Sequence, residues 1–438
     1  MKRFLLHSDN IEKSGFFWNM TSGLLMAFQS VVLLMILTRT VGLVVSGIFT
    51  IAYASANLFL NVGKYGMRNY QVSDLKYEYS FKTYRASRLI TSGAMILFSL
   101  IYVLIASHAN GYTFEKSLII MIMCLFKVPD AYEDVFYAEY QRRGRLDVGA
   151  KAMTLRLGTT TVLFAVTVII NHNLLISLSI STVFTYILLI YLLIATREIA
   201  SVPMSDSETD SDSSACKSIW PLLYSSFPVF ASIFMQFYII NSPKYAIDAQ
   251  LSDDLQAIYG FIAMPVFVIG LLNNFIFTPL IYPLSMKWKE SKIKEFNHII
   301  IRQTGIIVAI TLVCLSGAYL IGIPVLSILY NTDLGGYKAE LLLILVGGGF
   351  LATSGIYMTV LTIMRRQTAQ MIVYAVVSLV ALFASSPVVR RFGIAGAVYM
   401  YDGLMAILSV IFIVMIIIFV RNHKNPSSDL SDHLSDNL

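Results

Sequence analysis

Four charged side chains within eight residues form the feature of this sequence most able to do chemistry. Lys127, Asp130, Glu133 and Asp134 lie in the segment LIIMIMCLFKVPDAYEDVFYAEYQRRGRLDVGAK. In an α-helix, Lys127 and Asp134 project within about 20° of each other and Asp130 within about 60°, so one stripe carries a cation and two carboxylates. Such a stripe can couple transport to a proton or Na⁺, or it can lock neighbouring helices together by ion pairing.

The composition predicts that this segment lies in a membrane. Of the 438 residues, 57% are hydrophobic and only 13% are charged, against about 25% in ordinary soluble domains. Such a chain has too few charges to cover a water-exposed surface. Each charge at the centre of a bilayer costs about 2.5–3.5 kcal/mol, so the four side chains must face protein or water and not lipid.

The elements that position these residues are twelve expected spanning helices, which makes the fold class an all-α polytopic membrane protein. An even number of spans places both termini on one side, and that side receives 25 of the 32 Lys and Arg residues. The positive-inside rule makes it cytoplasmic. This topology accounts for the net charge of +6, and no nucleic-acid-binding module is visible. The spans lie near residues 15–38, 43–64, 86–107, 116–139, 152–171, 174–195, 218–241, 254–284, 301–322, 338–363, 369–386 and 395–420.

An acidic, Ser-rich stretch, SDSETDSDSS, falls between the sixth and seventh spans. It predicts a linker at 201–217 between an N-terminal six-helix bundle, 1–200, and a C-terminal bundle, 218–421. Parallel repeats of this kind are related by a pseudo-two-fold axis along the membrane normal. Residues 422–438 are polar and are expected to form a solvated cytoplasmic tail.

Three further charges lie in or near the expected spans, and each has two interpretations. Asp402 in the last span either couples transport to a proton or forms a pair within the bundle. Lys244 either receives an anionic headgroup or extends its ammonium group to the membrane surface. Arg39 is either an interfacial anchor or a phosphate ligand.

The sequence lacks the motifs of ATP-driven or hydrolytic membrane proteins. Its one Gly-Lys pair is followed by Tyr65, so no phosphate-binding loop is present. The six histidines are scattered, without metal-ligand spacing or a neighbouring nucleophile. We therefore expect no enzymatic activity and no cofactor, and a carrier driven by an H⁺ or Na⁺ gradient or by the gradient of its substrate.

Three stretches carry a resemblance to a known family: GMRNYQVSDLKYEYSFKTYRASR, PDAYEDVFYAEYQRRGRLDVGAK and INSPKYAID. With twelve spans in two halves, they resemble bacterial polysaccharide-biosynthesis membrane proteins, the lipid-linked oligosaccharide flippases of the multidrug/oligosaccharidyl-lipid/polysaccharide exporter superfamily. The resemblance implies a V-shaped pair of bundles around a partly cationic cavity. It also implies alternating access and an undecaprenyl-diphosphate-linked glycan as substrate. The expected location is the cytoplasmic membrane, and the expected partners are membrane lipids and the glycosyltransferases and polymerase of the same pathway.

A diphosphate headgroup requires Lys or Arg, and the headgroup candidates are Arg39, Arg68 and Lys244. The charges around residue 130 are net negative along their own helix and fit a diphosphate poorly. We therefore assign a second set of residues to coupling or gating, namely Lys127, Asp130, Glu133, Asp134 and Asp402.

Other functions are also compatible with such a chain. The nearest alternative is a cation-coupled multidrug exporter of the same fold. A peptidoglycan-precursor flippase usually has more than twelve spans. A membrane-bound glycan ligase or polymerase would need a long periplasmic loop with catalytic residues, which the expected spans leave no room for.

Overall fold

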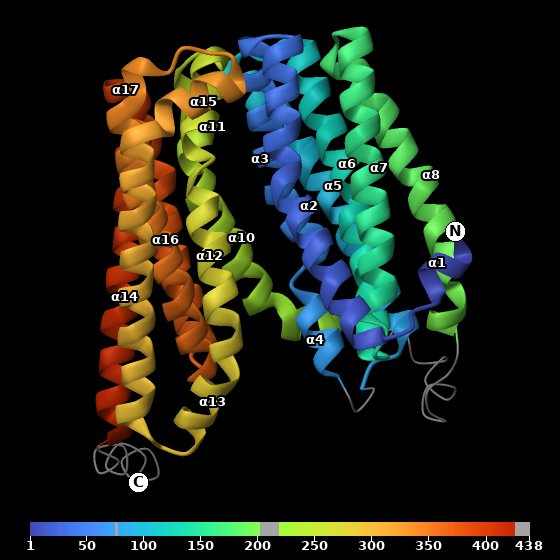
Figure 1. Ribbon diagram of the computed structural model, residues 1–438, viewed down its shortest axis with the longest axis vertical. Helices are drawn as coiled ribbons and strands as arrows, with labels where there is room; N and C mark the ends of the chain where they lie inside the picture. The colour runs from blue at the N-terminus through green and yellow to red at the C-terminus, as the bar shows by residue number, and fades with distance from the viewer. Residues whose placement is uncertain (75–77, 202–218, 425–438) are drawn as a thin grey trace. The chain divides into compact units, whose positions relative to one another are not determined.

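A computed structural model describes residues 1–74, 78–201 and 219–424, and these residues are almost entirely helical (Figure 1). Ten helical segments among them are long and apolar enough to cross a bilayer. The chain is thus a multi-pass membrane protein, as its composition predicts. Most of the expected linker at 201–217 and of the expected tail at 422–438 lies outside the described residues.

The helices of the first half match the predicted spans and extend beyond them at most ends. Ser80 and Thr113 are the N-cap residues just before the helices that begin at Phe81 and Phe114. Each of the two side chains accepts a hydrogen bond from the backbone N–H three residues further on. The helices are α1 (Lys2–Leu6), α2 (Ile11–Thr40), α3 (Leu43–Lys64), α4 (Met67–Ser73), α5 (Phe81–Asn110), α6 (Phe114–Arg142), α7 (Leu146–Asn171) and α8 (Leu174–Ser201).

The second half is more interrupted than the sequence predicts. The expected span at 254–284 is divided into three helices, and Pro265 and Pro279 stand at the breaks, where they cannot donate a backbone hydrogen bond. The helices are α10 (Ile219–Gln250), α11 (Asp253–Ala263), α12 (Val266–Phe277), α13 (Ile281–Lys289), α14 (Ile293–Gly317), α15 (Ile323–Tyr330), α16 (Lys338–Ile363) and α17 (Gln367–Lys424).

The last helix, α17, contains two of the predicted spans, 369–386 and 395–420. At Gly393 the backbone is non-helical, with φ of 60° and ψ of −139°, so the chain turns there between two helical parts. Glycine tolerates this conformation because it has no Cβ. Every predicted span therefore corresponds to helix, and the prediction of about twelve spanning helices is confirmed.

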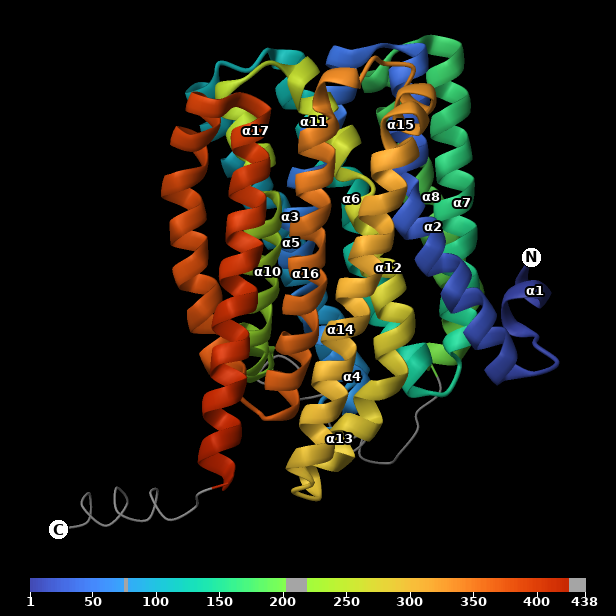
Figure 2. The same ribbon diagram turned by 60° about the vertical axis from the view of Figure 1, so that its left-hand side comes forward.

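The chain forms two compact units. Unit 1 comprises residues 1–237, 248–260 and 329–331, and unit 2 comprises residues 238–247, 261–328 and those from 332 onward. In unit 1, α6 packs against α3, α5, α7 and α8. In unit 2, α16 packs against α12, α14 and α17 (Figure 2). The pseudo-two-fold relation between the halves remains a prediction.

Candidate functional site

The four charges of α6 lie inside the bundle of unit 1. The exposed fractions of Lys127, Asp130, Glu133 and Asp134 are 1%, 7%, 2% and 5%. Lipid therefore does not reach them, as the sequence predicts. The carboxylates among them receive cations from other helices of the same unit.

The first group, which we call the Arg156 cluster, joins α7 to α6. The Arg156 Nε donates to Glu133 Oε2 at 2.6 Å, and its Nη2 donates to Glu133 Oε1 at 2.6 Å and to Asp130. Its Nη1 donates to Thr185 Oγ1 on α8 at 2.9 Å. All of these guanidinium contacts are buried, so Arg156 holds three helices together through one side chain.

Lys127 completes the Arg156 cluster. Its Nζ donates to Asp130 Oδ2 at 3.1 Å and to Gln29 Oε1 on α2 at 3.3 Å. The ammonium group also lies 4.8 Å from the centre of the Tyr53 ring on α3, close enough for a cation–π contact. The cluster contains two cations and two carboxylates, so its charges balance.

The second group, which we call the Asp134 cluster, joins α6 to α4 and α5. The Arg88 Nη2 donates to Asp134 Oδ2 at 2.9 Å, and the Arg68 Nη1 donates to Asp134 Oδ1 at 3.2 Å. Arg88 also donates to the backbone carbonyls of Gly63 and Lys64 at the end of α3. Two guanidinium groups thus share one carboxylate. The Arg88 side chain is fully buried, whereas 35% of the Arg68 side chain is exposed.

The four charges of α6 are net negative along their own helix, and the structure adds cations from other helices to them. Across both clusters, four cations oppose three carboxylates, which leaves one positive charge. The sequence does not show this balance, because the periodicity of one helix does not identify partners on other helices. The cations are Lys127, Arg156, Arg68 and Arg88, and the carboxylates are Asp130, Glu133 and Asp134.

Arg39 and Arg68 do not form one headgroup site. They lie beyond opposite ends of α3, whose 22 residues span about 33 Å, whereas one phosphate contact requires about 3 Å (Figure 1). The Arg39 Nε donates to the backbone carbonyl of Leu329 at 3.0 Å. Of these two arginines, Arg68 alone belongs to the charged clusters of α6.

The two candidates in unit 2 occupy separate environments. Lys244 is half-buried, and its Nζ donates to Asn241 Oδ1 at 3.1 Å, with no carboxylate beside it among the described residues. Asp402 lies against α16, where a Cβ added to Gly347 would stand 2.0 Å from Asp402 Oδ1. That oxygen is buried against the backbone of Gly347, and no cationic side chain pairs with it in the part of the chain that the structure describes.

Sequence reasoning missed the partners of α6, Arg88 and Arg156, because it counted both among the basic residues of the loops on the cytoplasmic side. It also missed a polar cluster at the start of α6. There the Lys116 Nζ lies 2.8 Å from Asp248 Oδ1 and 2.6 Å from Asp253 Oδ1, which ties the turn between α10 and α11 to α6. Burial and the neighbouring Asp248 raise the pKa of Tyr112, whose hydroxyl donates to that carboxylate.

The described residues contain no group of three or more His, Cys, Asp or Glu side chains that could hold a metal ion. The charged clusters instead pair carboxylates with guanidinium and ammonium groups. Chemically, this arrangement can hold helices together, bind an anion at the part-exposed Arg68, and exchange one ion-pair partner for another.

Comparisons with known proteins identify the fold. No protein-family model matches the sequence, and neither does any curated protein. Solved structures match along nearly the whole chain, and they are polytopic membrane transporters. An inward-facing multidrug resistance MATE family transporter of the MOP superfamily is similar with a TM-score of 0.65 and 15% identity, over 92% of this chain and 96% of the other.

Two further structures agree. A eukaryotic MATE transporter matches with a TM-score of 0.60 and 12% identity, over 93% of this chain and 96% of the other. A MOP superfamily transporter from Pyrococcus furiosus matches with a TM-score of 0.59 and 13% identity, over 97% and 98%. The protein therefore has the fold of the MATE transporters.

Proposed function

We propose that the protein is a flippase that moves an undecaprenyl-diphosphate-linked oligosaccharide from the cytoplasmic to the outer leaflet of the cytoplasmic membrane. The observation that carries the proposal is the positive charge left at the Asp134 cluster. Arg68 is part-exposed there, and it shares its carboxylate with a second, buried arginine. A diphosphate that approaches Arg68 meets an excess of cations, and a guanidinium group binds phosphate in a bidentate geometry.

In this proposal the substrate phosphate and Asp134 compete for Arg68, and this competition is one step of alternating access. A phosphate that binds Arg68 takes it away from Asp134, which then keeps only Arg88 as its ion-pair partner. The link between α4 and α6 weakens while the link between α5 and α6 remains. In this proposal the substrate loosens one contact of the bundle, and the Arg156 cluster keeps the rest of α6 in place.

The proposed coupling group for H⁺ or Na⁺ is Asp402. Its buried carboxylate has no cationic partner among the described residues and can accept a proton or bind a cation, whereas the carboxylates of α6 already have cationic partners. The proposed partners are the glycosyltransferases and the polymerase of the same surface-polysaccharide pathway.

The test is export in proteoliposomes with a short-chain polyprenyl-diphosphate oligosaccharide, alongside surface polysaccharide in cells. We expect Arg68→Ala to reduce translocation at least tenfold, since a hydrogen bond to a charged group contributes about 1.5–3 kcal/mol. Arg85→Ala is the matched control, because Arg85 is an exposed arginine on α5. Export by Arg68→Ala at the rate of the control would overturn the headgroup role.

The second candidate is a cation-coupled multidrug exporter. It is supported by the fold, since similar structures include a multidrug resistance transporter, and by the Asp402 carboxylate, which has no cationic partner among the described residues. The Pyrococcus furiosus transporter, however, is described as having a binding pocket of reversed polarity that suggests a different function. The fold therefore leaves the charge of the cargo open. Drug resistance of sensitive cells that express the protein, lost in Asp402→Asn, would favour this candidate over the flippase.

A further inference from the structure

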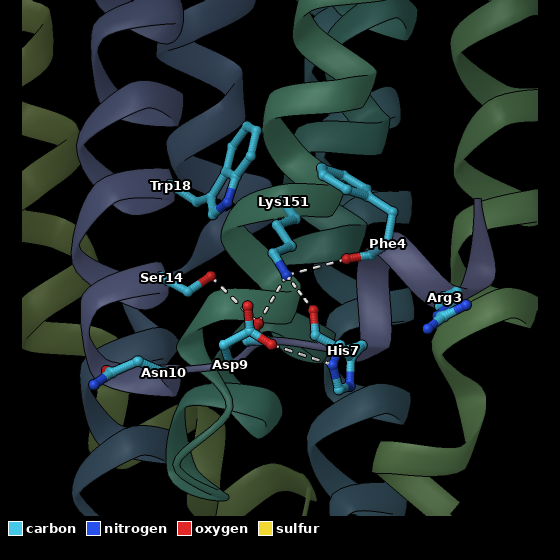
Figure 3. A pocket seen from close by; sticks show the side chains of 9 residues that line it. Arg3, Phe4, His7, Asp9, Asn10, Ser14, Trp18 and Lys151 are labelled. Carbon is cyan, nitrogen blue, oxygen red and sulfur yellow. Dashed lines mark hydrogen bonds and ion pairs between the residues drawn. The ribbon is translucent and has the colours of Figure 1, made fainter.

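Two cavities of unit 1 meet beside α1. The first, which we call the polar mouth, has a volume of about 550 Å³ and is lined mainly by the N-terminal segment of the chain (Figure 3). The second, which we call the apolar groove, has a volume of about 560 Å³ and runs along α2 and α7. Phe4, Trp18 and Lys151 line both cavities, so the two adjoin.

Lys151 builds the polar mouth. Its Nζ donates to the backbone carbonyls of Phe4 at 3.0 Å and His7 at 2.9 Å, and to Ser8 Oγ at 2.8 Å (Figure 3). These three bonds seat α1 on α7, and the side chain is buried although it carries a charge. The Ser8 hydroxyl donates in turn to Asp147 Oδ2 at 2.6 Å, which fixes the mouth in place.

The polar mouth is net positive. Its cations are Lys151 and the exposed Arg3, and the one carboxylate on its lining is the fully exposed Asp9, which lies 3.4 Å from His7 Nε2. The rings of Phe4 and Trp18 meet edge to face at 5.4 Å, where the polar mouth gives way to the apolar groove. Aromatic rings in this position are typical of a membrane–water interface.

The apolar groove has the length of an acyl chain. Its α7 wall includes Thr154, Gly158, Val162 and Val166, which repeat every four residues and so lie on one face of the helix. From Lys151 to Val166 the helix rises about 22 Å, whereas one leaflet of hydrocarbon is about 15 Å thick. Val162 and Val166 are 62% and 46% exposed, so the groove opens to lipid.

Gly158 keeps the apolar groove wide. A Cβ added there would meet only Leu25 Cδ1 of α2, at 3.8 Å, which is an ordinary contact that leaves space for an occupant. A basic head site joined to a long apolar channel matches a molecule with a phosphate at one end and a hydrocarbon chain at the other.

We propose that the polar mouth and the apolar groove together bind one anionic phospholipid of the surrounding leaflet. Its phosphate lies beside Arg3 and is attracted by the positive charge of Lys151, and one acyl chain lies between α2 and α7. The bound lipid braces α1 against these two helices. This site is independent of the proposed substrate, because the charged clusters of α6 do not line either cavity.

Native mass spectrometry of the detergent-purified protein with equal amounts of phosphatidylglycerol and phosphatidylcholine tests the head site. We expect the wild type to retain phosphatidylglycerol in excess. Arg3→Gln should reduce this preference about fivefold, as one Arg near an anionic lipid surface contributes about 1 kcal/mol. Asp9→Asn should raise it, while Arg421→Gln, at an exposed arginine of α17, should leave it unchanged.

Gly158→Leu tests the groove, because the added side chain occupies the acyl channel. We expect Gly158→Leu to retain neither phosphatidylglycerol nor phosphatidylcholine at this site. We also expect phosphatidylglycerol to raise the Tm of the wild type but not that of Gly158→Leu. Gly93→Leu is the matched control, since Gly93 is an exposed helical glycine with nothing within 4 Å of its Cβ position. Equal retention of the two lipids by the wild type would overturn the proposal, as would unchanged lipid retention in Gly158→Leu. Arg3→Gln and Asp9→Asn change only exposed side chains, so they test the head site even if Gly158→Leu fails to fold.

Discussion

Removing the charge of Arg156 and then removing a partner carboxylate should show how strongly the Arg156 cluster holds α6. Arg156→Met leaves Glu133 and Asp130 buried with only Lys127 to balance them. Breaking a buried ion pair in this way costs about 3–5 kcal/mol, because a buried carboxylate keeps no counter-charge. We therefore expect Arg156→Met to lower the free energy of unfolding by about that amount.

The double variant should be less unstable than the two single changes imply. Glu133→Gln alone leaves Arg156 in excess, and we expect it to cost about 1–3 kcal/mol. In Arg156→Met with Glu133→Gln, the remaining buried charges are Lys127 and Asp130, which already lie 3.1 Å apart and neutralise each other. The coupling between the two changes should therefore be about 2–3 kcal/mol, at the upper end of measured values for residues in one ion-pair network.

The assay is unfolding by sodium dodecyl sulfate in mixed micelles, followed by circular dichroism, for the wild type, both single variants and the double variant. Arg85→Met serves as the control, because an exposed arginine should change stability by no more than about 0.5 kcal/mol. Additivity of the two single changes within about 0.5 kcal/mol would refute the reasoning, because it would mean that the two side chains do not share a buried network.

Three further outcomes are expected. Asp402→Asn should abolish ion-driven transport while leaving Tm within a few degrees of the wild type, as measured in proteoliposomes with and without an imposed ion gradient; transport that still follows the gradient would argue against Asp402 as the coupling group. Lys116→Met should lower the free energy of unfolding by about 3–5 kcal/mol, because it leaves two carboxylates at the α10–α11 turn without their cation, and a value below 1 kcal/mol would contradict this. Gly47→Ala should destabilise the protein by about 1–3 kcal/mol or more in the same unfolding assay, because the new Cβ would stand 1.7 Å from the carbonyl oxygen of Asp253. Gly23→Ala is the control, since nothing lies within 4 Å of its Cβ position, and it should be neutral or stabilising.

Helical periodicity and the cost of burying charge were sufficient to predict the spans and the burial of the α6 charges. Hydrophobic runs of about 20 residues correspond to helices, because in a bilayer the backbone must satisfy its own hydrogen bonds. Lys127 and Asp130 are buried as predicted, since lipid cannot accommodate them. These are properties of single helices, which is why one sequence is enough to find them.

The identity of the partners could not be predicted in the same way. The positive-inside count places Arg88 and Arg156 with the basic residues of the cytoplasmic loops, which says nothing of their partners. The contacts of these residues depend on which helices are neighbours, and sequence spacing contains no such information.

The charges of α6 also affect how the chain enters the membrane. Helices α3 and α7 are among the ten apolar enough to cross a bilayer on their own composition, but α6 is not among them. Each of its buried charges opposes insertion by the translocation machinery, and Arg156, which neutralises two of them, is synthesised only after α6 is complete. We therefore expect stable insertion of α6 to require α7, so that these helices enter the lipid together and not one at a time.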